Sequence, residues 1–223
     1  MELEDYLRSD VLEVINKKRI RQAPEWKSVP EVRIEDISEY LFDVQDPKNS
    51  SLSIKKAYGS GAASYINGTP DNTYPLRFVC FEEYMNQFVF NDGQGNAKVA
   101  MLKEEPRPDL IVYNTDEGKK YFIIQELSEG KIAKKKIRAR QQLNAALELL
   151  CKSSVVKDYI SSFHHRLCIV SAKDGREAVL TPQDVAKGFM QIYQITPEPL
   201  FFSFGSMKRY DFQGMETSIV CLE

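Results

Sequence analysis

The chain has 223 residues, 43% of them apolar and 28% charged, and its formal net charge is −2. This composition is typical of an ordinary globular protein, and the slightly acidic balance excludes a histone-like nucleic-acid binder with charge over its whole surface. No segment approaches the ~18 uninterrupted apolar residues of a membrane span, and the acidic start Met-Glu-Leu-Glu-Asp excludes an ordinary signal peptide. We therefore expect a cytoplasmic protein with no membrane partner.

The N-terminal part, residues 1–45, is predicted to be helical. Residues 3–20 carry apolar side chains at helical spacing, and a second short helix is expected over Ile34–Phe42. Residues 46–75 are expected to form a loop-rich insertion, because Tyr58–Tyr74 is rich in Gly, Ala, Ser, Asn and Pro. With a core over 75–223, we expect one domain spanning residues 1–223.

The middle of the chain predicts a β-hairpin. Leu76–Phe90 is apolar and aromatic and fits either a strand or a helix, whereas Lys98–Leu102 is strand-like. Two further apolar runs, Leu110–Tyr113 and Tyr121–Leu127, are joined by Asn-Thr-Asp-Glu-Gly, which has the composition of a hairpin turn.

A basic helix is predicted to follow the hairpin from about Lys131. Six basic residues and no acid fall between Lys131 and Arg140, and the opposite side of this helix carries an apolar stripe. Such a run is more often a solvated face than a nucleic-acid site, although backbone phosphates are its natural partner.

The remaining predicted elements complete an α/β (α+β) fold with a mixed central sheet flanked by helices. They are helices over Val155–Phe163 and from Thr181 to about Tyr193, and strands over Leu167–Ser171, Leu200–Phe204 and Thr217–Leu222.

Two carboxylates stand out because each lies at an end of a hairpin strand. Asp109 opens the first strand after Pro108, and Glu126 lies near the close of the second. Strand side chains alternate between faces, so Glu126 and Ser128 project to one side, where Asp109 can meet them. Two carboxylates and a backbone carbonyl suit Mg²⁺, which keeps several waters. Taken singly, Asp109 as a turn residue and Glu126 as a solvent-facing strand end are more ordinary interpretations.

The order Pro108-Asp109, hairpin, Glu126-Leu127-Ser128 and basic helix resembles the PD-(D/E)xK superfamily of restriction-endonuclease-like nucleases, over roughly residues 105–150. The resemblance implies a Mg²⁺- or Mn²⁺-dependent nuclease of the restriction-endonuclease-like fold, acting on DNA or RNA in phage defence or a mobile element. It implies Asp109, Glu126 and the carbonyl of Leu127 as metal ligands. A further acid is implied from an early helix, for which Glu39 is preferred over Glu82 and Glu83.

The sequence departs from the family pattern at Ser128, where the lysine of the motif is expected. The resemblance then implies a replacement from the following helix, with Lys131 or Lys135 as candidates. The nucleic-acid contacts implied on the helix are Lys134, Lys135, Arg138 and Gln142, within residues 131–142.

Two other interpretations stay open. In one, the site is silent and the fold binds nucleic acid or a partner protein. In the other, the motif is coincidental in an unrelated α/β protein, so that Asp109 and Glu126 lie well apart. Restriction-like nucleases often work as homodimers. A small nuclease of this kind would also be expected to need a partner protein that directs it.

Overall fold

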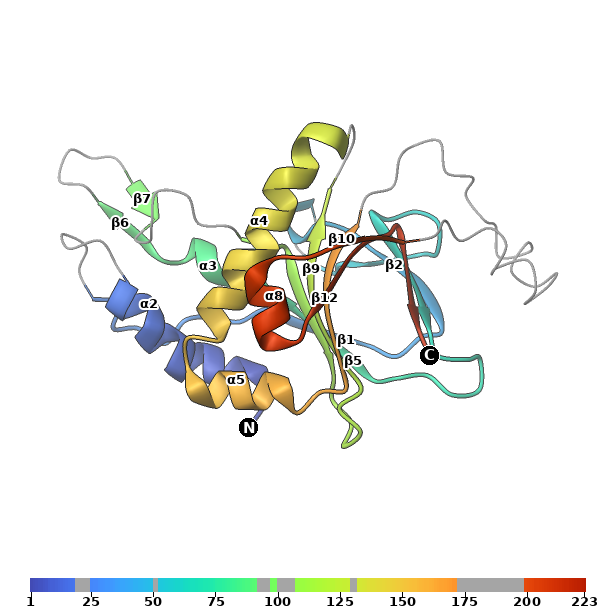
Figure 1. Ribbon diagram of the computed structural model, residues 1–223, viewed down its shortest axis with the longest axis horizontal. Coiled ribbons are helices and arrows are strands. Elements are labelled where there is room, and N and C mark those ends of the chain that lie inside the picture. The colour runs from blue at the N-terminus through green and yellow to red at the C-terminus, as the bar shows by residue number, and fades with distance from the viewer. Residues whose placement is uncertain (19–24, 50–51, 92–96, 100–106, 129–131, 172–198) are drawn as a thin grey trace.

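The computed structural model describes residues 1–18, 25–49, 52–91, 97–99, 107–128, 132–171 and 199–223, with the side chains of 49, 89–91, 97–99 and 132–136 left aside. The described chain forms three layers. A large mixed sheet (sheet A) has helices on one face and a smaller sheet (sheet B) on the other; Figure 1 shows α4, α5 and α8 on the helical side and β2 on the opposite side.

Sheet A has the strand order β1-β5-β8-β9-β10-β12-β11. From β1 to β9 neighbouring strands are antiparallel, β10 is parallel to both β9 and β12, and β11 is antiparallel to β12. Its strands are β1 (Ile34–Ile37), β5 (Leu76–Cys80), β8 (Leu110–Asn114), β9 (Tyr121–Leu127), β10 (His165–Ser171), β12 (Gln213–Glu216) and β11 (Leu200–Phe202).

Sheet B has the order β13-β4-β2-β3. Its β13 and β4 strands run parallel to each other and come from segments that lie far apart in the sequence. Its strands are β13 (Ile219–Leu222), β4 (Ala63–Asn67), β2 (Leu41–Val44) and β3 (Lys55–Lys56). Between β2 and β3 lies one 3₁₀ turn, η2 (Pro47–Asn49). A separate ribbon pairs β6 (Val89–Asn91) with β7 (Ala97–Val99).

The helical layer combines segments from both ends of the chain. The N-terminal helix is continuous but contains a π-helical turn, and α4 is the longest helix of the layer, with 19 residues. The helices are α1 (Leu3–Tyr6), η1 (Leu7–Val11), α2 (Leu12–Lys18), α3 (Phe81–Asn86), α4 (Ile132–Leu150), α5 (Ser154–Ser161) and α8 (Gly205–Tyr210).

Strand alternation divides the apolar residues of sheet A between two cores. Ile111 on β8 and Ile124 on β9 pack in the core beneath the helices, whereas their neighbours Leu110 and Ile123 pack in the core against sheet B. Glu126, near the end of β9, continues the helical face of the sheet in this alternation, and Asp109 directly precedes β8.

The expected mixed α/β class with a helical N-terminal segment is confirmed. The expected helix over Ile34–Phe42 is wrong, because these residues form β1 and the start of β2. The apolar residues of this short segment fit helical spacing as well as two strands, and pairing with β5 and β4 decides between them.

The loop expected over Tyr58–Tyr74 is wrong in its centre. Ala63–Asn67 is the buried strand β4, held between β2 and β13. Small and polar residues predict a loop when taken alone, but here both edges of the segment are paired within sheet B. The helix expected from Thr181 to Tyr193 lies outside the described residues.

No helix among the described residues combines the length and the apolar character that crossing a membrane would require.

Candidate metal centre

Asp109 and Glu126 are neighbours across the β8–β9 ladder. Leu110 pairs with Gln125 at the end of this antiparallel ladder, and Asp109 and Glu126 are the residues directly beyond this last pair. The charge of Asp109 is accordingly one of the causes that raise the pKa of Glu126. The structure therefore brings together the two acids that the hairpin pattern singles out.

Asp109 also organises the backbone around it. Its carbonyl oxygen accepts the N–H groups of Phe81 (3.0 Å) and Glu82 (3.4 Å), which begin α3. Its carboxylate oxygen Oδ2 accepts the N–H of Leu127 at 2.7 Å. Asp109 thus joins α3, β8 and β9, and one carboxylate oxygen is committed to that structural contact.

Two further carboxylates reach the same place from elsewhere in the chain. One oxygen each of Asp46, Glu82 and Asp109 lies within 4.8 Å of the others. Asp46 follows β2, and its Oδ1 accepts the N–H of Lys48 at 2.9 Å, which fixes the η2 turn. Glu82 lies in the first turn of α3, and its own N–H is one of the two that the carbonyl of Asp109 accepts.

A cation lies beside this acidic group. The ammonium Nζ of Lys48 is 2.6 Å from Oε2 of Glu82. The Lys48 side chain is 55% exposed and the Glu82 side chain 12% exposed, so that the pair sits at the boundary between the site and solvent.

Burial controls the electrostatics of the two strand carboxylates. Desolvation raises the pKa of Asp109 far above its ordinary value; the N–H of Leu127 opposes this rise, and the charges of Asp46 and Glu82 add to it. Desolvation also raises the pKa of Glu126, followed by repulsion from Asp109 and Glu82. Desolvation opposes the charge on Lys48, but its hydrogen bond to Glu82 and the surrounding acids leave its pKa raised.

The residues present fit a divalent cation. Among the described residues, Oε2 of Glu126 and Oγ of Ser128 are buried without a hydrogen-bond partner. Adjacent ligands of an octahedral Mg²⁺ ion lie about 3 Å apart and opposite ligands about 4.2 Å, so that oxygens of the three carboxylates, which lie within 4.8 Å of one another, would need to move only slightly closer to share one ion. Carboxylate oxygens are the ligands that Mg²⁺ and Mn²⁺ prefer.

The other residues expected at the site are distributed as follows. Glu39 lies in the turn between β1 and β2 rather than on a helix, and its carboxylate pairs with Lys55. That contact is the main reason why the pKa of Glu39 is lowered. Glu82, one of the two alternatives to Glu39, lies on α3, and one of its oxygens is within 4.8 Å of an oxygen of Asp109. Ser128 is 8% exposed and follows the end of β9.

The basic helix is only partly described. Lys131 lies outside the described residues, and Lys134 and Lys135 belong to α4 without described side chains. Arg138 is exposed. Gln142 is half-buried, and its Nε2 donates to the carbonyl of Arg107 at 3.1 Å, which ties α4 to the segment before β8.

Sequence reasoning missed Asp46 and Lys48. Asp-Pro-Lys-Asn reads as a polar turn, and nothing in it indicates that sheet B would bring the turn to the end of β8. The sequence already offers Glu82 as an alternative acid, but preferring it to Glu39 requires knowing that Phe81 begins a helix.

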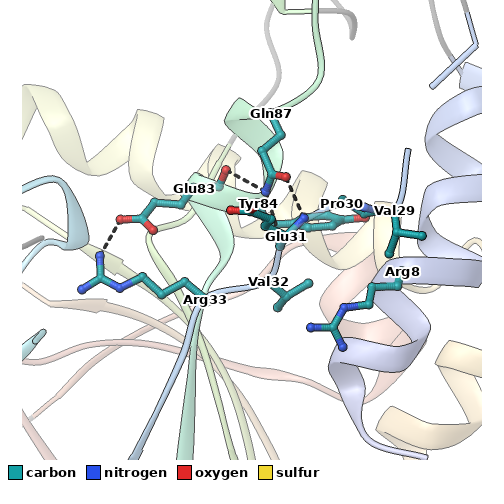
Figure 2. A pocket seen from close by; sticks show the side chains of 9 residues that line it. All are labelled: Arg8, Val29, Pro30, Glu31, Val32, Arg33, Glu83, Tyr84 and Gln87. Carbon is teal, nitrogen blue, oxygen red and sulfur yellow. Dashed lines mark hydrogen bonds and ion pairs between the residues drawn. The ribbon is translucent and has the colours of Figure 1, made fainter. Parts of the chain in front are cut away.

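A separate cavity of about 570 Å³ is lined by one side of α3, by residues 29–33 and by Arg8. Figure 2 shows Arg33 turned toward Glu83 and Gln87 turned toward Glu31. Among its lining residues, these polar groups pair with one another and hold residues 29–33 against α3. None of the four carboxylates described above lines this cavity.

Comparisons of the chain with protein-family models, with curated proteins and with solved structures gave no significant match.

Proposed function

We propose that this protein hydrolyses phosphodiester bonds of DNA or RNA with the help of a divalent cation. The observation that carries the proposal is the convergence of Asp46, Glu82 and Asp109 from three separate segments, with Glu126 close enough for the charges of Asp109 and Glu82 to raise its pKa. Burying so much like charge is costly, and a divalent cation is the partner that removes the cost.

In this proposal Asp46, Glu82 and Asp109 hold the cation together with Glu126, and Mg²⁺ or Mn²⁺ is the ion. A bound divalent ion lowers the pKa of a coordinated water and neutralises charge on the phosphate. Ser128 offers a hydroxyl that can donate or accept a hydrogen bond at the same edge. The N–H of Leu127 keeps the Asp109 carboxylate oriented.

Nucleic acid is the substrate class that the neighbouring charge favours. The first half of α4 carries the concentration of Lys and Arg, and its residue Arg138 is exposed. A run of basic residues in the sequence, beginning shortly after the strand that carries Glu126, suits a polyanion whose phosphates extend on either side of the cleaved bond.

Cleavage of single- and double-stranded DNA and RNA with Mg²⁺ or Mn²⁺ tests this function. We expect activity in the wild type that is reduced by at least about 100-fold in Glu126→Gln, as when transition-state charge stabilisation is removed. Glu148→Gln changes an exposed glutamate on α4 and is the matched control, expected to keep activity. The proposal would be contradicted if the wild type bound neither Mg²⁺ nor Mn²⁺ in calorimetry and cleaved none of the substrates.

The second candidate is a silent module that binds nucleic acid. Ser128 favours it, because a hydroxyl supplies no positive charge where the resembled family has a lysine. This alternative predicts oligonucleotide binding that persists in EDTA and in Glu126→Gln, but weakens in Lys135→Glu and Arg138→Glu.

A further inference from the structure

The positive charge nearest to the acidic group, among the residues with described side chains, comes from the η2 turn rather than from α4. Lys48 Nζ lies 2.6 Å from Glu82, and the charges of Asp46 and Asp109 also act on it. The ammonium is therefore part of the same electrostatic group as the candidate metal ligands, although its side chain is 55% exposed.

The backbone fixes where this lysine can be. Asp46 accepts the N–H of Lys48, so that one short turn presents a carboxylate and an ammonium two residues apart. Pro47 between them is buried. The turn is anchored because β2, which precedes it, pairs with both β3 and β4. Sheet B thus positions Lys48 beside the acidic group.

A purely structural role explains this arrangement poorly. An ion pair with one partner more than half exposed contributes little to stability. One ammonium cannot balance the charge that four ionised carboxylates would carry, so that Lys48 does not replace a divalent cation. What it adds is a compact cation with three donors, able to contact a phosphate oxygen from the solvent side.

We infer that Lys48 is the substrate-contacting cation of this site and supplies the charge that Ser128 lacks. This inference rests on the proposed phosphodiesterase function. In the free protein Glu82 holds the ammonium at the edge of the acidic group, where a bound phosphodiester would meet it. The sequence position of this cation, 61 residues before Asp109, explains why the hairpin motif gives no sign of it.

Lys48→Ala, Lys48→Arg and the control Lys55→Ala test the inference. Lys55 is 41% exposed and pairs with Glu39, so that it matches Lys48 in exposure and pairing outside the acidic group. Three quantities are measured: single-turnover cleavage with Mg²⁺ or Mn²⁺, binding of a labelled oligonucleotide in Ca²⁺, and Mn²⁺ affinity by calorimetry without nucleic acid.

We expect Lys48→Ala to reduce cleavage by about 100-fold or more and to weaken oligonucleotide binding. Mn²⁺ affinity should be unchanged or tighter, because a competing positive charge is removed. Lys48→Arg should retain part of the activity, and Lys55→Ala should stay within about twofold of the wild type in all three measurements.

Cleavage by Lys48→Ala within about threefold of the wild type would overturn the inference while leaving the proposed function intact. Loss of Mn²⁺ binding together with a lowered melting temperature would also overturn it, because it would assign Lys48 a structural role. A wild type that binds no metal and cleaves nothing would remove the proposed function and the inference with it.

Discussion

At the scale of one residue, Glu126 shows how the candidate site destabilises the folded, metal-free protein. Its carboxylate is largely buried beside Asp109, and one of its oxygens has no hydrogen-bond partner among the described residues. A carboxyl whose pKa is raised by folding binds its proton more tightly in the folded state than in the unfolded state. The contribution of Glu126 to stability is therefore most favourable below its unfolded pKa of about 4.3. It is lost progressively as the pH rises toward its folded pKa.

Glu126→Gln should accordingly stabilise the metal-free protein. We expect a gain of about 1–2 kcal/mol in the free energy of unfolding at pH 8, with a much smaller gain at pH 4, because the amide keeps the shape and removes the charge. Urea unfolding in EDTA at both pH values measures it. Adding Mg²⁺ at 100 times its Kd should stabilise the wild type by about 2.7 kcal/mol and leave the variant nearly unchanged. Equal stability of the two proteins in EDTA at pH 8 would contradict the expected charge cost.

The individual site residues differ in how far the sequence predicts them. Asp109 and Glu126 are predictable because a hairpin fixes their relative position through local register alone. Asp46 and Lys48 are not, because their place depends on sheet B packing against sheet A over long sequence separations. The preference for Glu39 depends on a helix that does not form, whereas Glu82 lies near Asp109 because the carbonyl of Asp109 accepts the first N–H groups of α3.

At the scale of elements, a partly buried ionic network fixes the N-terminal helix to sheet A. Arg77 on β5 contacts Glu4 at 2.7 Å and Asp36 on β1 at 2.7 Å. The other oxygen of Glu4 accepts the hydroxyl of Tyr113 on β8 at 2.6 Å. This network joins α1 to three strands of sheet A.

Arg77→Met should be strongly destabilising, because Glu4 would remain buried without its cation. We expect a loss of about 3–5 kcal/mol in the free energy of unfolding. Lys17→Met, which breaks the exposed pair with Glu13 on α2, is the control and should cost at most about 1 kcal/mol. Similar costs for the two variants, measured by urea denaturation, would show that burial of the network does not matter.

The elements that the sequence predicts well are those with long, uniform patterns. Both hairpin strands, α4 and β10 lie close to their predicted ranges, and α4 buries Ala139, Leu143 and Leu147 as its apolar stripe predicts. Short segments were less predictable. Residues 34–42 and 63–67 are too brief for periodicity to separate helix, strand and loop, and their conformation is decided by strands that pair with them from distant parts of the chain.

At the scale of the whole molecule, the two sheets are joined by buried polar groups as well as by apolar packing. The hydroxyl of Tyr65 on β4 donates to Oε1 of Gln125 on β9 at 2.5 Å. Nε2 of Gln125 donates in turn to Oγ of Ser171 on β10 at 2.8 Å. The Tyr65 ring stacks on Phe42 in the same core. The chain of hydrogen bonds fixes the alignment of sheet B against sheet A.

Tyr65→Phe keeps the ring and removes the donor, which leaves a buried amide oxygen of Gln125 unsatisfied. We expect a loss of about 1–3 kcal/mol in the free energy of unfolding, read from the urea midpoint at constant m-value. Because sheet B also delivers Asp46 and Lys48, Mn²⁺ affinity should fall in parallel. A variant as stable as the wild type would show that apolar packing alone aligns the sheets.

The parallel pairing of β13 with β4 has a consequence for synthesis of the protein. Ser64 and its partner Ile219 are 155 residues apart, so that β4 keeps one edge unpaired until residue 222 has left the ribosome. Until then a nascent chain presents an open strand edge beside an aromatic surface that includes Tyr65 and Phe42, the kind of edge that invites aggregation. The turn carrying Asp46 and Lys48 follows β2 of the same sheet. The hairpin acids need only β8 and β9, whereas the sheet that positions Asp46 and Lys48 is completed only when β13 pairs with β4.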